Sequence, residues 1–274
     1  MAGPIDFRSA FGGVAEQTSR VLVVDTHTHV ISDDLERYPL QVADYPGVEW
    51  VYEAPVTAEE LLAELAAADV DRAVLVQALG GYGTDNSYVV DARAAYPGSF
   101  SAVAIVDDPA ELDALVAAGV GGVRFYAVGG GGPLQDEVTW ETARRLGLRV
   151  SAATVPEHLP ALVEAVAAHP DVILALDHCG FAPESIGDYA HLENLYLKVT
   201  PHVLDAGEPA AMLERLAEQF GLDRLMWGSD YSQTHDRPYA ELADQARAAC
   251  AGLSQSEQAQ FMGGTALALW PELA

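Results

Sequence analysis

Short apolar runs alternate with longer amphipathic segments along most of this chain. The runs are rich in Val, Leu, Ile and Ala and are bounded by polar or turn-forming residues, which is typical of buried strands. They predict strands at about 21–25, 73–77, 101–106, 122–126, 148–153, 172–177, 195–199 and 224–228. The segments between them predict helices at about 57–68, 87–96, 109–118, 135–146, 156–169, 208–220 and 238–250, with shorter ones near 183–191, 254–262 and 265–270.

This alternation of strand and helix predicts the fold class. Strands joined by helical crossovers are parallel, and eight such units in 274 residues fit a (β/α)8 TIM barrel. An open doubly wound sheet is the alternative, but no GxGxxG motif follows the first strand, and Gly129–Gly132 lacks the Lys-Ser/Thr of a P-loop. We therefore expect an N-terminal arm at 1–20 and a single barrel at 21–274, with an aromatic-rich loop at 31–55.

Composition limits the partners. The chain has 41 acidic and 14 basic residues, a formal net charge of −27, which disfavours nucleic acid and anionic membranes. It contains no apolar run long enough to span a membrane and no secretory signal pattern at its start. Two distant cysteines, Cys179 and Cys250, are expected to be free thiols. We expect a cytoplasmic protein that acts on a small molecule, and the sequence leaves a homo-oligomer open.

Polar residues with catalytic chemistry gather at the predicted strand ends. In a barrel these ends share one face, where active sites lie. Each residue also has a plain structural explanation, such as a packed core histidine or a loop cap, but a common location at strand ends favours an active site. The candidates at or near these ends are His27, His29, Tyr82, Arg124, Tyr126, His178, Lys198, His202 and Asp230.

Several blocks resemble the amidohydrolase superfamily, and within it the amidohydrolase-related branch. DTHTHV at the first strand and GSDY after the last are its two ends, and the likeness extends over about residues 21–270. The blocks GVGGVRFY, ILALDHCGFAP, NLYLKVT and RLMWGSDY are similar to the 2-pyrone-4,6-dicarboxylate lactonase and sugar-lactonase group. The resemblance implies a barrel enzyme that hydrolyses a lactone.

The resemblance also implies residue roles. His27, His29 and His178 match histidines of the first and sixth strands, and Asp230 matches the eighth-strand aspartate that activates water. These four are the expected catalytic residues. Arg124 and Lys198 lie in blocks that contact substrate, and Tyr126, Tyr82 and His202 are weaker substrate-binding candidates.

Metal binding is where the chain departs from many superfamily members. The fifth strand offers Ser151, Ala152, Ala153 and Thr154 in place of a ligand histidine, and the fourth strand has no lysine. His27, His29 and Asp230 are candidates for a three-ligand site, but ligation would compromise Asp230 as a free base. We therefore expect no required cofactor, with a single divalent metal such as zinc as the alternative.

Three hypotheses for function follow. The first is lactone or cyclic ester hydrolysis by water that Asp230 activates, with the imidazoles stabilising the oxyanion. Few cations are available at the rim, so the substrate is expected to carry at most one carboxylate, and the aromatic-rich loop at 31–55 favours an aromatic-like substrate. The second is metal-dependent non-oxidative decarboxylation on the same barrel. The third is a biosynthetic tailoring enzyme or binder that has lost hydrolysis.

Overall fold

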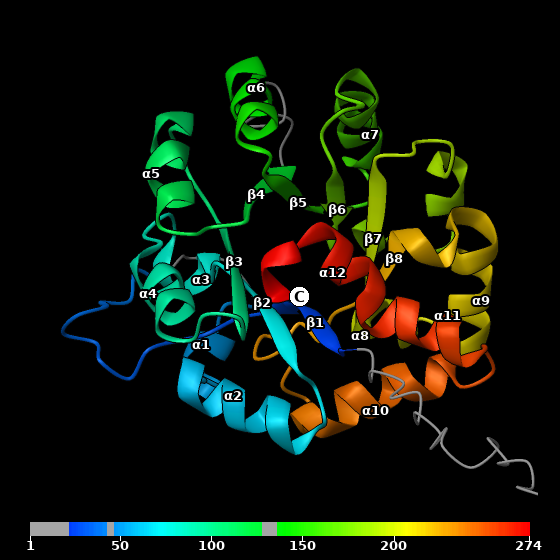
Figure 1. Ribbon diagram of the computed structural model, residues 1–274, viewed down its shortest axis with the longest axis horizontal. Coiled ribbons are helices and arrows are strands. Elements are labelled where there is room, and N and C mark those ends of the chain that lie inside the picture. Colours follow the sequence, from blue (N-terminus) through cyan, green and yellow to red (C-terminus); the bar gives the residue numbers. More distant parts are fainter. Residues whose placement is uncertain (1–21, 43–46, 128–135) are drawn as a thin grey trace, which may run out of the picture.

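The computed structural model describes residues 22–42, 47–127 and 136–274. Eight parallel strands, hydrogen-bonded in chain order, form a nearly closed barrel with helices outside it (Figure 1). The strands are β1 (Val24–Thr28), β2 (Arg72–Val76), β3 (Phe100–Ala104), β4 (Gly122–Ala127), β5 (Arg149–Thr154), β6 (Leu174–Leu176), β7 (Leu195–Val199) and β8 (Leu225–Trp227). The predicted (β/α)8 barrel is confirmed. The predicted arm at 1–20 and the glycine run at 129–132 lie outside the described residues.

The longer helices follow the strands as the amphipathic segments predict, whereas the four-residue helices at 50–53, 79–82 and 201–204 were not predicted. The helices are α1 (Trp50–Glu53), α2 (Ala58–Ala67), α3 (Leu79–Tyr82), α4 (Ser87–Ala95), α5 (Leu112–Ala117), α6 (Glu137–Leu146), α7 (Leu159–Ala168), α8 (Pro201–Leu204), α9 (Pro209–Phe220), α10 (Tyr239–Cys250), α11 (Gln255–Ala259) and α12 (Thr265–Leu269). Short 3-10 segments lie at Pro109–Glu111, Asp177–Phe181, Ile186–Tyr189, Leu222–Arg224 and Pro271–Leu273, and a π-helical turn at Gln260–Gly264 joins α11 to α12. Thr57 precedes α2 and forms a capping box with Glu60.

The first strand lies later than its apolar run suggests. The strand was predicted at 21–25, but β1 spans Val24–Thr28 and includes His27, with an irregular register against β2 between Asp25 and Thr28. Its polar residues are bonded to the end of β8 and to the segment after it: Thr26 Oγ1 donates to Trp227 O at 2.6 Å, and Asp230 N donates to His27 O at 2.8 Å. These bonds connect the first strand to the last.

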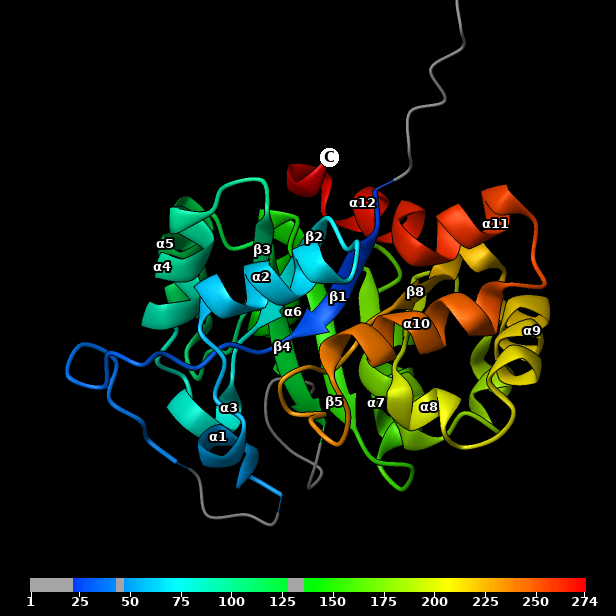
Figure 2. The ribbon, with the colours of Figure 1, turned by 90° about the horizontal axis from the view of Figure 1, so that it is seen from below.

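The barrel interior is apolar at its amino end and polar at its carboxyl end. Near the amino end, inward residues of the strands pack against the C-terminal segment, notably Trp270 and Leu273. Two residues further along several strands, the inward positions are polar, as in Ala175 followed by Asp177 and Tyr196 followed by Lys198. Figure 2 shows α11 and α12 at one end of the barrel and α1, α3 and α8 at the other. The polar end is therefore the one available to a ligand.

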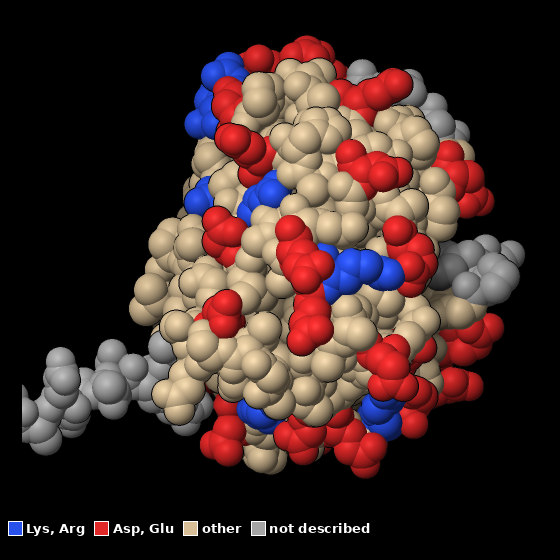
Figure 3. Space-filling model, turned by 90° about the vertical axis from the view of Figure 1, so that its right-hand side faces the viewer, with Lys and Arg blue, Asp and Glu red and all other residues tan. Residues whose placement is uncertain are grey.

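The surface reflects the composition. On the face in Figure 3, acidic side chains are widespread and basic ones are fewer. Among the described residues, no helix is both long and apolar enough to cross a membrane. Cys179 and Cys250 are free thiols and are buried, as expected.

Candidate active site

Two histidines of β1 and its end point into the polar mouth of the barrel. His27 is fully buried, and His29, the first residue after the strand, is 1% exposed. The Nδ1 atom of His29 lies 2.8 Å from the carbonyl oxygen of Val76. Because a carbonyl only accepts hydrogen bonds, Nδ1 must carry the proton, and Nε2 of His29 keeps a bare lone pair.

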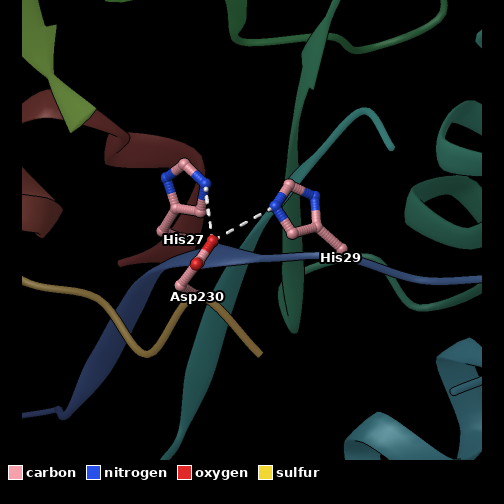
Figure 4. A group of neighbouring side chains, drawn as sticks. All are labelled: His27, His29 and Asp230. Carbon is pink, nitrogen blue, oxygen red and sulfur yellow. Dashed lines mark ion pairs between the residues drawn. The ribbon is translucent and has the colours of Figure 1, made fainter. Parts of the chain in front are cut away.

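Asp230 completes a group of three with these histidines. Its backbone is left-handed (φ 58°), and its side chain is fully buried. Oδ1 of Asp230 lies 3.4 Å from Nε2 of His27 and 3.4 Å from Nε2 of His29, and Figure 4 shows both rings directed at this one oxygen. The carboxyl ends of β1 and β8 thus bring two imidazoles and a carboxylate together, as the sequence predicted.

The geometry of this group fits a single metal ion. None of the three facing atoms, Nε2 of His27, Nε2 of His29 and Oδ1 of Asp230, has a hydrogen-bond partner, although all are buried. Buried polar atoms are rarely left unpaired. Two atoms that bind one tetrahedral zinc at about 2.0–2.1 Å lie about 3.3 Å apart, close to the 3.4 Å separations here. These residues therefore fit a divalent cation.

Two further histidines surround the same carboxylate. Nε2 of His178 lies 4.0 Å from Asp230 Oδ1, and its Nδ1 lies 2.9 Å from the Thr200 hydroxyl. Nε2 of His202 lies 3.2 Å from Asp230 Oδ2, which also accepts a hydrogen bond from Thr234. His178, His202 and Asp230 also lie close enough to hold a metal, but the His202 side chain is 43% exposed and Oδ2 already has partners. The buried group with unpaired atoms fits better.

The charge states suit ligation. Burial alone would raise the pKa of Asp230, but the imidazoles of His178, His202 and His29 outweigh it and hold that pKa well below the usual range. Burial lowers the pKa of His27 well below its usual value, against the pull of Asp177, and lowers the pKa of His178 to about 4. Near pH 7 the site therefore holds an ionised Asp230 carboxylate and neutral imidazoles at His27 and His178, and these are the forms that bind metals.

A buried ionic cluster lies behind His27. Asp177 Oδ1 lies 2.9 Å from Lys198 Nζ and accepts a hydrogen bond from Ser151 Oγ at 2.7 Å, while Asp177 Oδ2 accepts from Arg124 Nε at 2.9 Å. Burial alone would raise the pKa of Asp177, but Lys198, His27 and Arg124 hold it well below the usual range. Lys198 is the only lysine in the chain, and it is fully buried.

The predicted substrate-binding residues occupy different places. Arg124 and Lys198 lie at the barrel mouth but bind Asp177, and the guanidinium of Arg124 lies 4.8 Å from the ring centre of Tyr126. His202 borders the site directly. Tyr82 packs in α3, where its hydroxyl accepts a hydrogen bond from the backbone of Ser32 at 2.8 Å. Substrate contact by these residues remains a prediction.

A cavity borders the site at the carboxyl end of the barrel. It measures about 350 Å³ and is bordered by His202 and Thr234, the two partners of Asp230 Oδ2. Its one arginine, Arg237, is paired with two acidic residues of the same cavity, Asp205 at 2.6 Å and Asp236 at 2.9 Å. Of the aromatic loop, Trp50 reaches the site, with its ring 5.4 Å from that of His29.

Sequence reasoning missed Asp177, Ser151, Thr200 and Thr234. Asp177 ends the apolar run ILALD immediately before His178, so its position at a strand end was a usable signal. Ser151 was considered only as the absence of a histidine. The hydroxyls of Thr200 and Thr234 matter through partners that the sequence alone does not indicate.

Fold and site together describe a barrel enzyme with a two-histidine, one-carboxylate centre at the carboxyl ends of its strands. The chain belongs to the amidohydrolase family, whose model matches residues 24–271. No protein of curated function matches it in sequence.

Solved structures share the fold. An amidohydrolase from Burkholderia multivorans with bound zinc is 17% identical, with a TM-score of 0.73 and coverage of 91% of this chain and 99% of that chain. A 5-carboxyvanillate decarboxylase from Sphingomonas paucimobilis is 16% identical (TM-score 0.71, coverage 92% and 99%). A dihydroxybenzoic acid decarboxylase from Polaromonas sp. JS666 with bound manganese is 14% identical (TM-score 0.66, coverage 91% and 97%).

The expectation that no metal is required is wrong. It rested on the missing ligand of the fifth strand, where Ser151 binds Asp177 instead. The three atoms that could hold a metal come from β1, its end and the segment after β8, so the fifth strand is not needed to complete the set. The zinc and manganese in two of the similar structures agree with this correction.

Proposed function

We propose that this protein hydrolyses a lactone or related cyclic ester with a divalent cation, zinc as the first choice, held by His27, His29 and Asp230. The observation that carries the proposal is the convergence of three buried, unpaired ligand atoms at 3.4 Å separations. The similar amidohydrolase with bound zinc supports the choice of metal. When bound, such a cation lowers the pKa of water and polarises a carbonyl group.

Asp230 has two oxygens with different surroundings, which resolves the conflict between ligand and base. Oδ1 faces His27 and His29, whereas Oδ2 faces His202 and Thr234. One oxygen of a carboxylate can ligate while the other accepts the proton of the attacking water. In this proposal Oδ2 takes that proton and later returns it to the leaving alcohol, while the adjacent His202, at the border of the cavity, orients the carboxylate.

His178 stabilises the charge that develops on the carbonyl oxygen. Its pKa of about 4 keeps the ring neutral near pH 7. In the proposed arrangement the Thr200 hydroxyl donates to Nδ1, and Nε2 then carries the proton and donates to the oxyanion. Nε2 of His178 lies 4.0 Å from Asp230 Oδ1, which leaves it beside the metal group rather than in it.

The charges near the site favour a substrate with no carboxylate, or at most one. Arg124 and Lys198 are buried and bound to Asp177, and Arg237 is bound to two carboxylates. A dicarboxylate would therefore meet no unpaired cation among these three. The ring of Trp50 beside His29 supports a flat, aromatic-like substrate.

A panel of neutral, monocarboxylate and dicarboxylate lactones tests this proposal. We expect ring opening of neutral or monocarboxylate members, seen as a product heavier by one water, by zinc-loaded protein. Chelation should abolish turnover, and added zinc should restore it. Chelator-resistant turnover, or no turnover of any lactone by protein shown to contain zinc, would contradict the proposal.

Non-oxidative decarboxylation is the second candidate. Two of the similar structures are decarboxylases of aromatic acids, and the same ligand group would serve that reaction. Release of CO₂ from hydroxybenzoates, without lactone opening, would favour it. We prefer hydrolysis because Arg124, Lys198 and Arg237 are all paired with carboxylates, which favours a neutral substrate.

A further inference from the structure

One ring nitrogen of the site faces two partners with opposite hydrogen-bonding roles, a donor and an acceptor. Nδ1 of His27 lies 3.3 Å from Nζ of Lys198 and 3.3 Å from Oδ1 of Asp177. An ammonium group only donates hydrogen bonds, and a carboxylate only accepts them. A neutral imidazole carries one proton, so its Nδ1 satisfies one of these partners at a time.

The choice decides what the other ring nitrogen can do. If Nδ1 donates to Asp177, then Nε2 is bare and can ligate a cation beside Asp230. If Nδ1 accepts from Lys198, then Nε2 carries the proton, points it toward Asp230 Oδ1 at 3.4 Å, and cannot ligate. His29 has no such choice, because its Nδ1 faces a backbone carbonyl.

We propose that Asp177 and Lys198 act in opposition on the tautomer of His27, Asp177 favouring the metal-binding form and Lys198 the form with a proton on Nε2. Both are positioning residues, and the inference rests on the proposed metal site. Lys198 therefore weakens metal binding although it lies beside the site, while Asp177 strengthens it. A purely structural role for the pair predicts that loss of either partner weakens binding.

The surroundings make Lys198 suitable for substitution. Without Lys198, Asp177 keeps Arg124 at 2.9 Å and the Ser151 hydroxyl at 2.7 Å, so its charge remains paired. Methionine is similar in length to the lysine stem and is apolar, which suits a fully buried position. Lys198→Met should therefore fold, whereas Asp177→Asn leaves two buried cations without a carboxylate and is the riskier variant.

The test measures zinc affinity of the metal-free full chain by competition with a chromophoric chelator. We expect Lys198→Met to bind zinc more tightly than the unmodified chain, by up to about tenfold, and Asp177→Asn to bind it about 10- to 100-fold more weakly. The exposed pair Asp113 and Arg145 provides matched controls, because Asp113→Asn and Arg145→Met remove the same charges at the surface. Weaker zinc binding by Lys198→Met, or unchanged binding by Asp177→Asn, would overturn the proposal.

Nitrogen NMR of the histidine rings gives a second readout that does not depend on metal. In metal-free protein, Lys198→Met should shift His27 toward the form protonated at Nδ1, and an unchanged tautomer would overturn the inference. Because Lys198 is the chain's only lysine, selective lysine labelling reports its ammonium as a single side-chain signal. Failure of the unmodified chain to bind zinc would contradict the proposed function, whereas the metal-free spectra still decide the tautomer question.

Discussion

Replacing Asp230 with asparagine keeps the shape of the side chain but removes its negative charge. The side chain is fully buried, with Oδ1 toward His27 and His29 and Oδ2 accepting from Thr234. In Asp230→Asn the amide oxygen is best satisfied at the Oδ2 position, where Thr234 and His202 can donate to it. The amide NH₂ group then faces the two Nε2 atoms, and it has no lone pair with which to bind a cation.

The magnitude follows from the two roles assigned to this carboxylate. Loss of a positioned base lowers turnover by about 10²–10⁴-fold, equivalent to about 3–5 kcal/mol of transition-state stabilisation. Loss of the one anionic ligand in the group should weaken zinc binding by more than the roughly 10- to 100-fold typical of residues that only orient a ligand. The fold should persist, since the substitution preserves volume and the hydrogen bond from Thr234.

The assay measures zinc affinity and then turnover at saturating zinc, with Asp113→Asn as the surface control. Circular dichroism confirms the fold of each variant. Turnover within tenfold of the unmodified chain at saturating zinc would refute Asp230 as the base. Unchanged zinc affinity would refute it as a ligand.

Three further outcomes are expected. Zinc at 100 times its dissociation constant should stabilise the unmodified chain by about 2.7 kcal/mol, and an unchanged melting temperature would contradict metal binding. A Cβ on Gly228 would lie 2.9 Å from that of His27, so Gly228→Ala should cost about 1–3 kcal/mol and weaken zinc binding in the same titration. Burial raises the pKa of Asp25 from 3.8 to about 6, so between these values the folded chain binds more protons than the unfolded chain, and its stability falls as pH rises. Asp25→Asn removes the titrating group and should therefore not lose these roughly 3 kcal/mol of stability between pH 4 and pH 7. The melting temperature of the variant minus that of the unmodified chain should rise over this pH range. A constant difference would contradict the prediction.

The barrel and the convergence of its polar strand ends could be predicted from the sequence, because both depend on local patterns. The residues that converge are His27, His29, His178 and Asp230. Apolar runs locate strands, and parallel strands bring their carboxyl ends to one face. The first strand was misplaced because its end is polar. Thr26 and His27 continue the strand through bonds to Trp227 of β8 and to Asp230 after it, a tertiary effect that no local pattern records.

The ionic cluster could not be predicted from single strands. Arg124, Asp177 and Lys198 belong to different strands or strand ends, and their contact depends on barrel register, which pairs Arg124 with Ser151 and Ser151 with Ala175. Each cation considered alone resembled a substrate-binding residue. The metal error had a related origin, since counting ligands strand by strand ignored the two separate oxygens of Asp230.

The distribution of charge bears on the direction of the proposed reaction. The buried site is nearly neutral before a cation binds. It holds two negative charges, on Asp177 and Asp230, and two positive charges, on Lys198 and Arg124. Outside it, the cavity carries Asp205 and Asp236 against Arg237, on a chain of net charge −27. A neutral lactone enters such a field without a penalty, whereas the hydroxy acid formed by hydrolysis is an anion that the field repels. Product release should therefore slow as salt screens this field, while entry of a neutral substrate should not change.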